Sequence, residues 1–334
     1  MSAEVSVVDP FSIHADAALP FAAAMIDPQA AEPALRSTCP LLAEARLLRL
    51  EVIRHKTGRR GLIAYEFETR DGERRRVLGK VRAKGLDRKT FEAVQDLRAH
   101  GFDESAPDLI CIPPALGVVP RWNMWVQAEV PGAPATGALL HGDDGDLPAR
   151  IAAAAFKLHR TSVVPPRAHT MERELEILQK RLGEVARAQP PLSERIARLL
   201  AECDRLAATL GPPEARPIHR DFHPAQVLVD GARLWLLDFD LFSVGEPAID
   251  VGNFIAHVTE LSLRTFGDAS RRDDIARGIE DAYVSAAGEH TRASVRVLTI
   301  LSLARHVWIS TLFEERREFT ERLLALCEAR AGAH

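Results

Sequence analysis

Between Leu48 and Lys84 apolar and polar residues alternate with a period of two, and this pattern constrains the fold of the chain more than any other. Three such runs follow one another, LRLEVIRHK, RRGLIAYEFETR and ERRRVLGKVRAK, and Asp71-Gly72 separates the last two. An Asp-Gly pair between two alternating runs is a strong signal for a β-hairpin. We therefore expect a twisted, half-exposed antiparallel sheet in this part of the chain.

The pattern changes from sheet to helix near Pro131-Gly132. Before that point, helical spacing of apolar residues predicts one helix over 86–102, and two more strand-like segments follow at 109–119 and 124–130. After it we expect helices at 148–161, 172–187, 193–209, 248–263, 271–287, 292–312 and 314–329, interrupted only by a strand-like stretch at 226–238. The predicted fold is α+β and bilobal, with a small sheet lobe and a large helical lobe. Its predicted parts are a loosely helical extension (1–40), the sheet lobe (41–130) and the helical lobe (131–334).

Composition excludes several classes of function. A chain of 334 residues is long for one core, and its net charge of −4 provides no basic field for nucleic acid or a membrane surface. No apolar run approaches the roughly 20 residues that span a bilayer, and acidic residues precede the first apolar stretch, unlike a signal peptide. The four scattered cysteines lack zinc spacing. We expect a cytoplasmic protein, and the oligomeric state stays open.

Acidic residues cluster in the segment HRDFHPAQVLVDGARLWLLDFD, which runs from His219 to Asp240. Asp230-Gly231 predicts a hairpin turn, so Asp221 and Asp238 should emerge at the same end of the hairpin with Gln226 beside them. One carboxylate that positions a hydroxyl and a second that holds a divalent metal suit phosphoryl transfer. Oxygen ligands of this kind are those that Mg²⁺ prefers.

These motifs resemble the protein-kinase-like superfamily, and within it the aminoglycoside phosphotransferase and choline kinase branch. The shared features are His-x-Asp, an amide five residues later, and Asp-Phe-x after a hairpin. The segments GEPAIDVGNF, FKLHRT and VQAEVPGAP are also similar to that branch, and the likeness covers roughly residues 48–330. The resemblance implies a kinase-like bilobal fold in which the sheet lobe binds the nucleotide and the helical lobe carries the catalytic loop and the acceptor site.

In the helical lobe, the resemblance implies that Asp221 is the catalytic base or hydroxyl-positioning group and that Asp238 coordinates Mg²⁺. Gln226 stands where the family has a metal-binding asparagine, and its extra methylene is a departure from the pattern. Asp240 has three open roles: a second metal ligand, a substrate contact or a helix cap.

The catalytic loop is predicted to include His219 and Arg220 together with Asp221. By resemblance, His219 packs beneath the loop, and Asp250 hydrogen-bonds the loop backbone. Arg220 is shared with protein kinases, where it reads a phosphorylated activation loop. Because Asp250 follows Asp240 by only ten positions, such a loop does not fit, and a small-molecule kinase is favoured over a protein kinase.

In the sheet lobe, the resemblance implies that Lys80 neutralises the nucleotide phosphates, with Lys84 as the rival. Glu92 is the candidate helix partner of that lysine. The connector would offer backbone groups to adenine through Gln127, Glu129 and Val130.

The predicted function is an ATP-dependent kinase that uses Mg²⁺ and phosphorylates a hydroxyl of a sugar, an amino sugar or aminoglycoside, or an amino alcohol. GTP in place of ATP stays open, and no motif identifies the acceptor. One alternative is a pseudokinase-like regulatory module that binds nucleotide, motivated by Gln226. A zinc hydrolase that uses His219, Asp221 and His223 is a more distant alternative.

Overall fold

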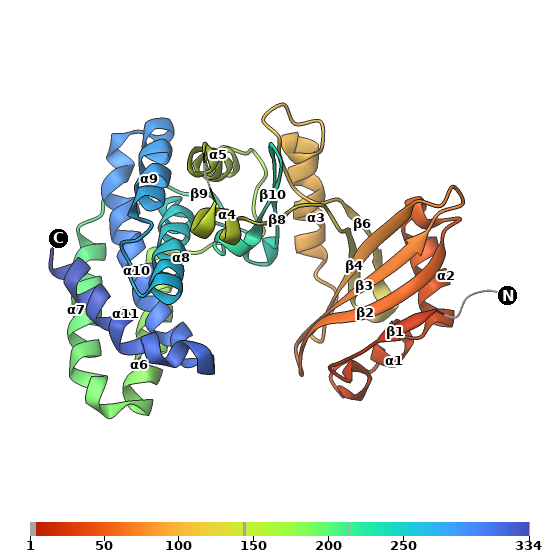
Figure 1. Cartoon of the computed structure of the whole chain (residues 1–334), viewed down its shortest axis with the longest axis horizontal. Helices are drawn as coiled ribbons and strands as arrows, with labels where there is room; N and C mark the ends of the chain where they lie inside the picture. Colours follow the sequence, from red (N-terminus) through yellow and green to blue (C-terminus); the bar gives the residue numbers. More distant parts are fainter. Residues whose placement is uncertain (1–4, 143–144, 213, 334) are drawn as a thin grey trace. The chain divides into compact units, whose positions relative to one another are not determined.

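The computed structural model describes residues 5–142, 145–212 and 214–333. The chain divides into two compact units, Met1–Pro131 and Gly132–His334 (Figure 1). The first unit is built around a β-sheet and the second is mainly helical. This confirms the predicted α+β class, and the change from sheet to helix falls at the Pro131-Gly132 pair.

A six-stranded sheet forms the first unit, in the order β1-β2-β3-β4-β7-β6. All neighbouring strands are antiparallel except the parallel pair β1 and β2. At the predicted Asp-Gly turn, Gly72 has φ of +82°, a conformation that glycine adopts without steric cost. The strand bounds are β1 Ser6–Val8, β2 Arg46–Lys56, β3 Arg60–Glu68, β4 Arg74–Arg82, β6 Ala115–Val119 and β7 Met124–Ala128.

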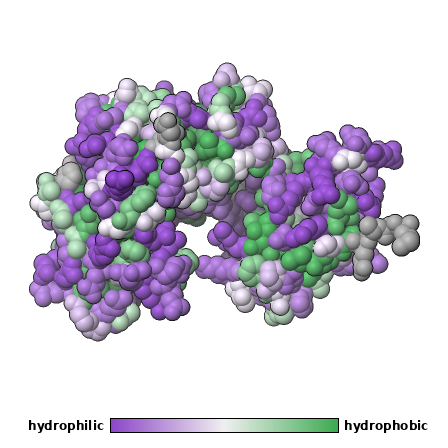
Figure 2. Space-filling view, viewed as in Figure 1, coloured by the Kyte–Doolittle hydropathy of each residue, from purple (hydrophilic) through white to green (hydrophobic). Residues whose placement is uncertain are grey.

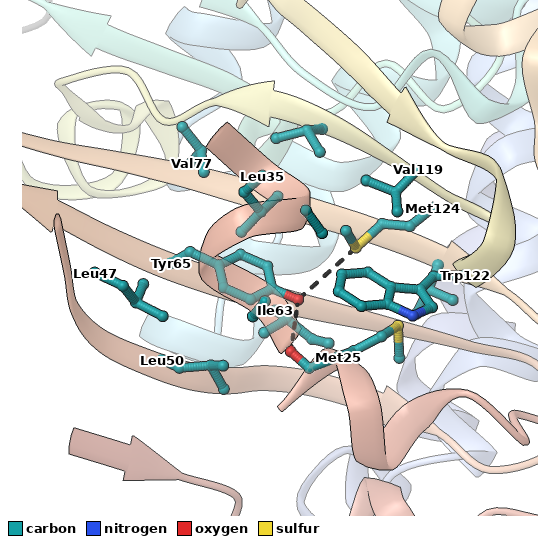
Figure 3. Packing of buried hydrophobic residues seen from close by; sticks show 14 of the residues in the cluster. Met25, Leu35, Leu47, Leu50, Ile63, Tyr65, Val77, Val119, Trp122 and Met124 are labelled. Carbon is teal, nitrogen blue, oxygen red and sulfur yellow. Dashed lines mark hydrogen bonds between the residues drawn. The ribbon is translucent and has the colours of Figure 1, made fainter. Parts of the chain in front are cut away.

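The described N-terminal residues form part of the first unit's core. Helices α1 (Ala22–Met25) and α2 (Pro28–Thr38) contribute Met25 and Leu35 to a buried apolar cluster with the sheet. Tyr65 of β3 donates a hydrogen bond from its hydroxyl to the carbonyl oxygen of Met25 at 3.1 Å (Figure 3). The boundary predicted at residue 40 therefore does not separate an extension from the sheet. The burial of these N-terminal residues could not be predicted from the sequence, because short, irregular segments bury apolar residues at no fixed period.

One main helix of the first unit, α3 (Arg88–Leu97), begins where the Asp87 carboxylate accepts the Thr90 N–H at 3.2 Å. It continues into a π-helical turn (Arg98–Phe102), in which Gly101 has φ of +90° and ends the helix as predicted. The predicted strand at 109–119 is split into β5 (Ile110–Cys111) and β6 by two prolines, which cannot donate to a strand ladder.

Helices form most of the second unit, and α8 and α10 lie closest to its centre. Gly252 of α8 explains how near they approach, because a Cβ atom there would lie 2.6 Å from the backbone carbon of Leu298 in α10. The predicted helix at 314–329 begins later than expected, since 314–319 form a 3₁₀ turn. The helix bounds are α4 Ala135–His141, α5 Leu147–His159, α6 Met171–Ala188, α7 Ser193–Ala208, α8 Ala248–Phe266, α9 Asp273–Ala287, α10 Arg292–Thr311 and α11 Thr320–Gly332.

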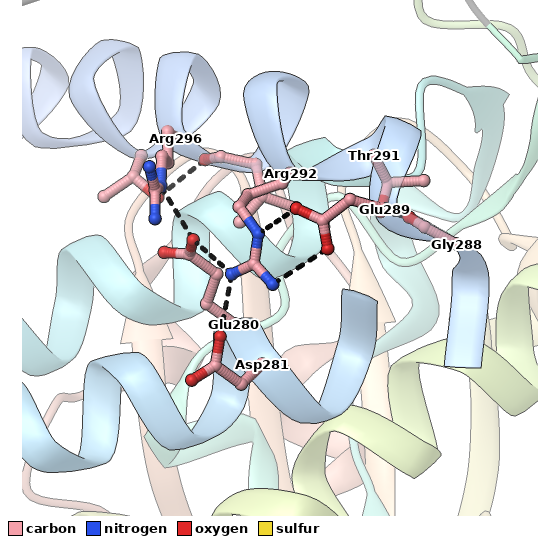
Figure 4. Close-up of polar contacts among 9 residues, drawn as sticks. Glu280, Asp281, Gly288, Glu289, Thr291, Arg292 and Arg296 are labelled. Atoms are coloured by element: carbon pink, nitrogen blue, oxygen red, sulfur yellow. Dashed lines mark hydrogen bonds and ion pairs between the residues drawn. The ribbon is translucent and has the colours of Figure 1, made fainter. Parts of the chain in front are cut away.

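Ion pairs of Arg292 join the middle of α9 to the start of α10 (Figure 4). The Arg292 guanidinium contacts the carboxylates of Glu280 at 3.0 Å and Asp281 at 2.7 Å, and Glu289 lies on its other side. Hydrophilic residues cover much of the visible face of this unit (Figure 2). Among the helices of the described ranges, none is long and apolar enough to cross a bilayer.

Short strands of the second unit form and flank the acidic segment His219–Asp240. Strands β10 (Val227–Asp230) and β11 (Arg233–Leu236) form the predicted hairpin, and β8 (Ala133–Pro134) pairs with β10. Strands β9 (Arg216–Ile218) and β12 (Ser243–Gly245) pair antiparallel. The sequence did not predict β8, β9 or β12, because two or three residues are too few to show a period.

Candidate active site

The open end of the hairpin brings Gln226 and Asp238 to one place. Val227 pairs with Leu236 at the last register position, and just beyond it the Leu237 N–H donates to the carbonyl oxygen of Gln226 at 2.9 Å. Gln226 and Leu237 are therefore the first residues beyond the paired strands, and Asp238 follows Leu237 directly. The predicted hairpin and its register are confirmed, and the placement of Asp221 beside Asp238 stays a prediction.

His219 ties the loop of Asp221 to the strand that leads to Asp238. Its ring is fully buried, and its Nε2 donates to the carbonyl oxygen of Leu237 at 2.7 Å. Its Nδ1 accepts the backbone N–H of Asp221 at 3.3 Å. This confirms the prediction that His219 packs beneath the loop. It also means that both ring nitrogens are engaged with backbone, so the ring has no lone pair left for a metal.

Asp250 holds the same loop from below and has no exposed surface. Its carboxylate accepts the backbone N–H of His219 at 2.7 Å and that of Arg220 at 2.6 Å. His159 contacts the carboxylate through Nε2 at 3.0 Å and the Tyr283 hydroxyl through Nδ1 at 2.9 Å. The predicted contact between Asp250 and the loop backbone is confirmed. The hydrogen bond between His159 and the Asp250 carboxylate was not predicted from the sequence.

Two residues of the site have left-handed backbone. Arg220 has φ of +69° and Asp238 has φ of +60°. Non-glycine residues in this region cost roughly 1–3 kcal/mol and persist where surrounding contacts hold them, often at functional sites. Asp221 follows Arg220 in the chain, and its side chain is 41% exposed and so open to a ligand. Asp240 is half-buried in the 3₁₀ turn Phe239–Leu241.

A second group of polar residues braces the loop behind Asp221. The Asn253 amide donates to the carbonyl oxygen of Phe222 at 2.8 Å and accepts from the Arg305 guanidinium. Arg305 also pairs with Glu174 at 3.2 Å. Burial lowers the pKa of Arg220, and the Glu174 carboxylate opposes that shift. Neither Asn253 nor Arg305 was predicted from the sequence, and only Asn253, three residues after Asp250, had a position that could have indicated its role.

His223 lies beside Asp221, with 3.9 Å between its Nε2 and the Asp221 Oδ1. Its Nδ1 accepts the Ala225 N–H at 3.3 Å, and its ring stacks on that of His257 at 4.5 Å. No three His, Cys, Asp or Glu side chains in the described part of the chain are placed to share a metal ion. The arrangement, with His219 engaged elsewhere, contradicts a zinc site made by His219, Asp221 and His223.

The predicted phosphate-binding lysine lies in the first unit. Lys80 is in β4, opposite Trp125 of β7, and its Nζ lies 4.8 Å from the centre of the Trp125 ring. Lys84 is exposed and lies beyond the end of β4 at Arg82. The prediction that Lys80 and Lys84 share one strand is therefore wrong. Glu92 is exposed on α3, and within the described residues it makes no ion pair with Lys80.

The connector residues differ in whether their backbone N–H and carbonyl groups already make hydrogen bonds. Gln127 is buried in β7, between β4 and β6. The Glu129 N–H donates to the Arg76 carbonyl oxygen at 3.0 Å, and its carboxylate pairs with the Arg76 guanidinium at 2.9 Å. The Glu129 carbonyl and the Val130 N–H make no hydrogen bond to any residue in the described ranges. These two groups are the connector's candidates for contacts with a base.

Solved structures with the same fold include small-molecule kinases. A choline/ethanolamine kinase family protein from Mesorhizobium loti has a TM-score of 0.60 at 17% identity, covering 91% of this chain and 95% of that one. For choline kinase from Cryptosporidium parvum the TM-score is 0.58 at 12% identity, covering 92% and 96%. An aminoglycoside phosphotransferase in complex with ADP and hygromycin B has a TM-score of 0.55 at 14% identity, covering 86% and 94%. These likenesses establish the bilobal protein-kinase-like fold.

At the level of sequence, no curated protein matches the chain. The sequence profile of the phosphotransferase enzyme family, however, matches residues 59–288, which include β3 to β7 of the first unit and both Asp221 and Asp238 of the second. That match covers more than half of the chain, and this protein belongs to the phosphotransferase enzyme family.

Proposed function

We propose that the protein is an ATP-dependent kinase that transfers the terminal phosphoryl group to a hydroxyl of a small molecule. The observation that carries the proposal is the link that His219 makes between the two carboxylate-bearing segments, through the Asp221 N–H and the Leu237 carbonyl. Phosphoryl transfer depends mainly on positioning and on neutralised phosphate charge, and this link joins a group for each task. Membership of the phosphotransferase family supports the same reaction.

In this proposal Asp221 orients the acceptor hydroxyl and accepts its proton. Its partial exposure suits contact with a ligand, while Asp250 and His219 hold the backbone around it. In this role the carboxylate accepts the proton only as the oxygen–phosphorus bond forms, so its main contribution is alignment. Arg220 contributes to the position of Asp221 through its backbone, whose conformation the Asp250 carboxylate fixes.

The oxygen donors at the hairpin's open end fit Mg²⁺. Asp238 and Gln226 would hold the ion, with Asp240 as a further ligand, because Mg²⁺ uses one or two protein carboxylates and takes phosphate and water oxygens for the rest. When bound, the ion neutralises charge on the nucleotide phosphates. Gln226 keeps the carbonyl oxygen of an asparagine but places it one methylene further from the backbone.

In the first unit we propose that Lys80 contacts the nucleotide phosphates and that the Glu129 carbonyl and Val130 N–H contact the base. The Trp125 ring beneath Lys80 supports this, since a cation over an aromatic face keeps its charge while it is partly buried. The exposed position of Glu92 speaks against the predicted pair with Lys80, so we do not propose that pair.

The test is ADP release from Mg-ATP, and in parallel GDP release from Mg-GTP, with sugars, amino sugars and amino alcohols as acceptors. Asp221→Asn should lower acceptor-dependent turnover by orders of magnitude and leave nucleotide binding in place. Asp230→Asn is the matched control, because Asp230 lies at the opposite end of the same hairpin. Unchanged turnover in Asp221→Asn would disprove the role of Asp221, and a protein that binds neither nucleotide would disprove the kinase.

Gln226 favours a second candidate, a pseudokinase-like module that binds nucleotide and acts through a partner. In that case the native protein binds Mg-ATP without turnover, and Gln226→Asn raises turnover steeply from near zero. Efficient turnover by the native protein would exclude the regulatory candidate.

A further inference from the structure

Three histidine rings follow one another from Asp221 into the helical unit. His223 lies beside Asp221 and stacks on His257 of α8 with 4.5 Å between ring centres. His257 in turn packs edge-on against His306 of α10 at 4.3 Å. The row ends in the core: the His223 side chain is 18% exposed, His257 is half-buried and His306 is 1% exposed.

The close packing of α8 on α10 places these rings together. Gly252, which precedes His257 by just over one turn, allows the backbones to approach at Leu298. The 3₁₀ turn Pro224–Gln226, which begins directly after His223, also contacts α8. His223 and His257 therefore meet because the loop of Asp221 rests on α8.

The surroundings of these imidazoles favour the neutral form. Burial lowers the pKa of His223, and burial also lowers the pKa values of His257 and His306 well below the usual range for histidine. The next contributions to the shift of His257 come from His306, His223, Arg305 and Arg316, all of which are basic groups. The same two arginines act on His306.

Asp221 and Asp238 act on His223, at the catalytic end of the row, whereas the acidic side chains packed near His257 and His306 are already engaged. Glu260 of α8 is 2% exposed and accepts from the Arg264 guanidinium at 2.7 Å, with Arg316 at 4.0 Å. Glu174 is 4% exposed and pairs with Arg305 at 3.2 Å and with His169 at 2.7 Å. Neither carboxylate is available for a ligand.

We infer that the face formed by His223, His257, Arg305 and Arg316, here called the basic face, receives the acceptor, and that the acceptor carries an anionic group, a carboxylate or a phosphate. This inference rests on the proposed kinase function, since it makes Asp221 the neighbour of the acceptor hydroxyl. A cationic amine placed against His257 would lose its hydration shell and would face two guanidinium groups, while the exposed Asp221 carboxylate would already hold the acceptor hydroxyl. An anion gains imidazole N–H donors and a favourable field.

Four small molecules that share a vicinal diol unit test the inference in the full-length protein with Mg-ATP: 3-amino-1,2-propanediol, glycerol, glycerate and glycerol 3-phosphate. Binding is followed by the NMR signal of the His257 ring, assigned with His257→Gln, and turnover by ADP release. We expect the anions to shift the ring signal and to bind at least about tenfold more tightly than the amine. Comparison of glycerate with glycerol 3-phosphate distinguishes a carboxylate from a phosphate.

A substitution that changes the charge of the basic face provides a second experiment. His257→Glu should reverse the order so that the amine binds more tightly than glycerate. The matched control is His290→Glu, because His290 is an exposed histidine of the same unit that lines a different cavity. His257→Gln, which adds no charge, shows by its circular dichroism and thermal unfolding whether the position tolerates substitution.

The outcomes separate this inference from the kinase itself. Tighter binding of the amine in the native protein, or no shift of the His257 ring with any of the four molecules, would overturn the inference. ADP release with the amine alone would retain the kinase and overturn the anionic acceptor. Anion binding at His257 without any ADP release would support the acceptor class and count against the kinase.

Discussion

The Asp250 carboxylate accepts the backbone N–H of His219 at 2.7 Å, although the two residues are 31 positions apart in the chain. The same carboxylate accepts the N–H of Arg220, whose φ of +69° is unfavourable for a side chain of its size. Asp250 thus holds the loop of Asp221 in a conformation that local sequence alone would not maintain.

Removing this carboxylate should destabilise the helical unit. Asp250→Ala leaves two buried backbone N–H groups and the His159 ring without their acceptor, and we expect a loss on the order of 3 kcal/mol in the free energy of unfolding. Urea unfolding measures the loss, and hydrogen exchange at the His219 and Arg220 amides should speed up. Asp204→Ala, at an exposed aspartate that accepts a hydrogen bond from Gln179, should change stability by less than about 1 kcal/mol. Equal effects of the two substitutions would contradict the role of Asp250.

Glu174 should make stability depend on pH in the acid range. Burial would raise the pKa of this carboxyl, but the hydrogen bond from His169 and the charge of Arg305 outweigh it and lower the pKa to about 2 from 4.5. A lowered carboxyl pKa contributes stability that is complete above the unfolded value and is lost as the pH falls from 4.5 towards 2. The contribution is on the order of 3 kcal/mol.

Glu174→Gln tests this directly. The stability difference between the native protein and this variant, measured by urea unfolding, should be largest above about pH 5 and should shrink as the pH is lowered to 3. Glu176→Gln is the control, since Glu176 lies on the same helix but is exposed. A difference independent of pH would show that Glu174 does not titrate in this way.

Gly252 and Gly183 should respond to alanine with opposite signs. At Gly252 a Cβ atom would lie 2.6 Å from the Leu298 backbone, so Gly252→Ala should destabilise the α8–α10 packing by about 1–3 kcal/mol. At Gly183, in the middle of α6, the nearest atom is 3.5 Å away, in the flexible Arg187 side chain. Gly183→Ala should therefore stabilise the protein by up to about 1 kcal/mol through helix propensity. Thermal unfolding measures both, and stabilisation by Gly252→Ala would contradict the close approach.

Leu35 should be as important for the first unit as a residue of the sheet. It is fully buried in the cluster that contains Trp122, so Leu35→Ala should cost about 2–5 kcal/mol and should shift urea unfolding followed by tryptophan fluorescence. Phe11→Ala, at a side chain that is 45% exposed, should have a much smaller effect. A negligible effect of Leu35→Ala would restore the interpretation of residues 1–40 as a separate extension.

Local sequence was sufficient for the regular elements and for the end of the hairpin that carries the site. Alternation placed β2, β3 and β4, and helical spacing placed α5 to α10 within a few residues, because each element has one face on a core and repeats its pattern. The Asp230-Gly231 turn was enough to place Gln226 opposite Leu237, the residue before Asp238, since the register of a two-stranded hairpin follows from its turn.

Tertiary structure alone decided which distant residues support those elements. The burial of Leu35 against the sheet, the position of His159 beneath Asp250 and the contact of His257 with His306 all join segments that no sequence period connects. Periodicity reports which face of an element is buried, but it carries no information about which other element covers that face. The charge of the face beside Asp221 depends on such pairings, because Arg305 and His257 belong to different helices.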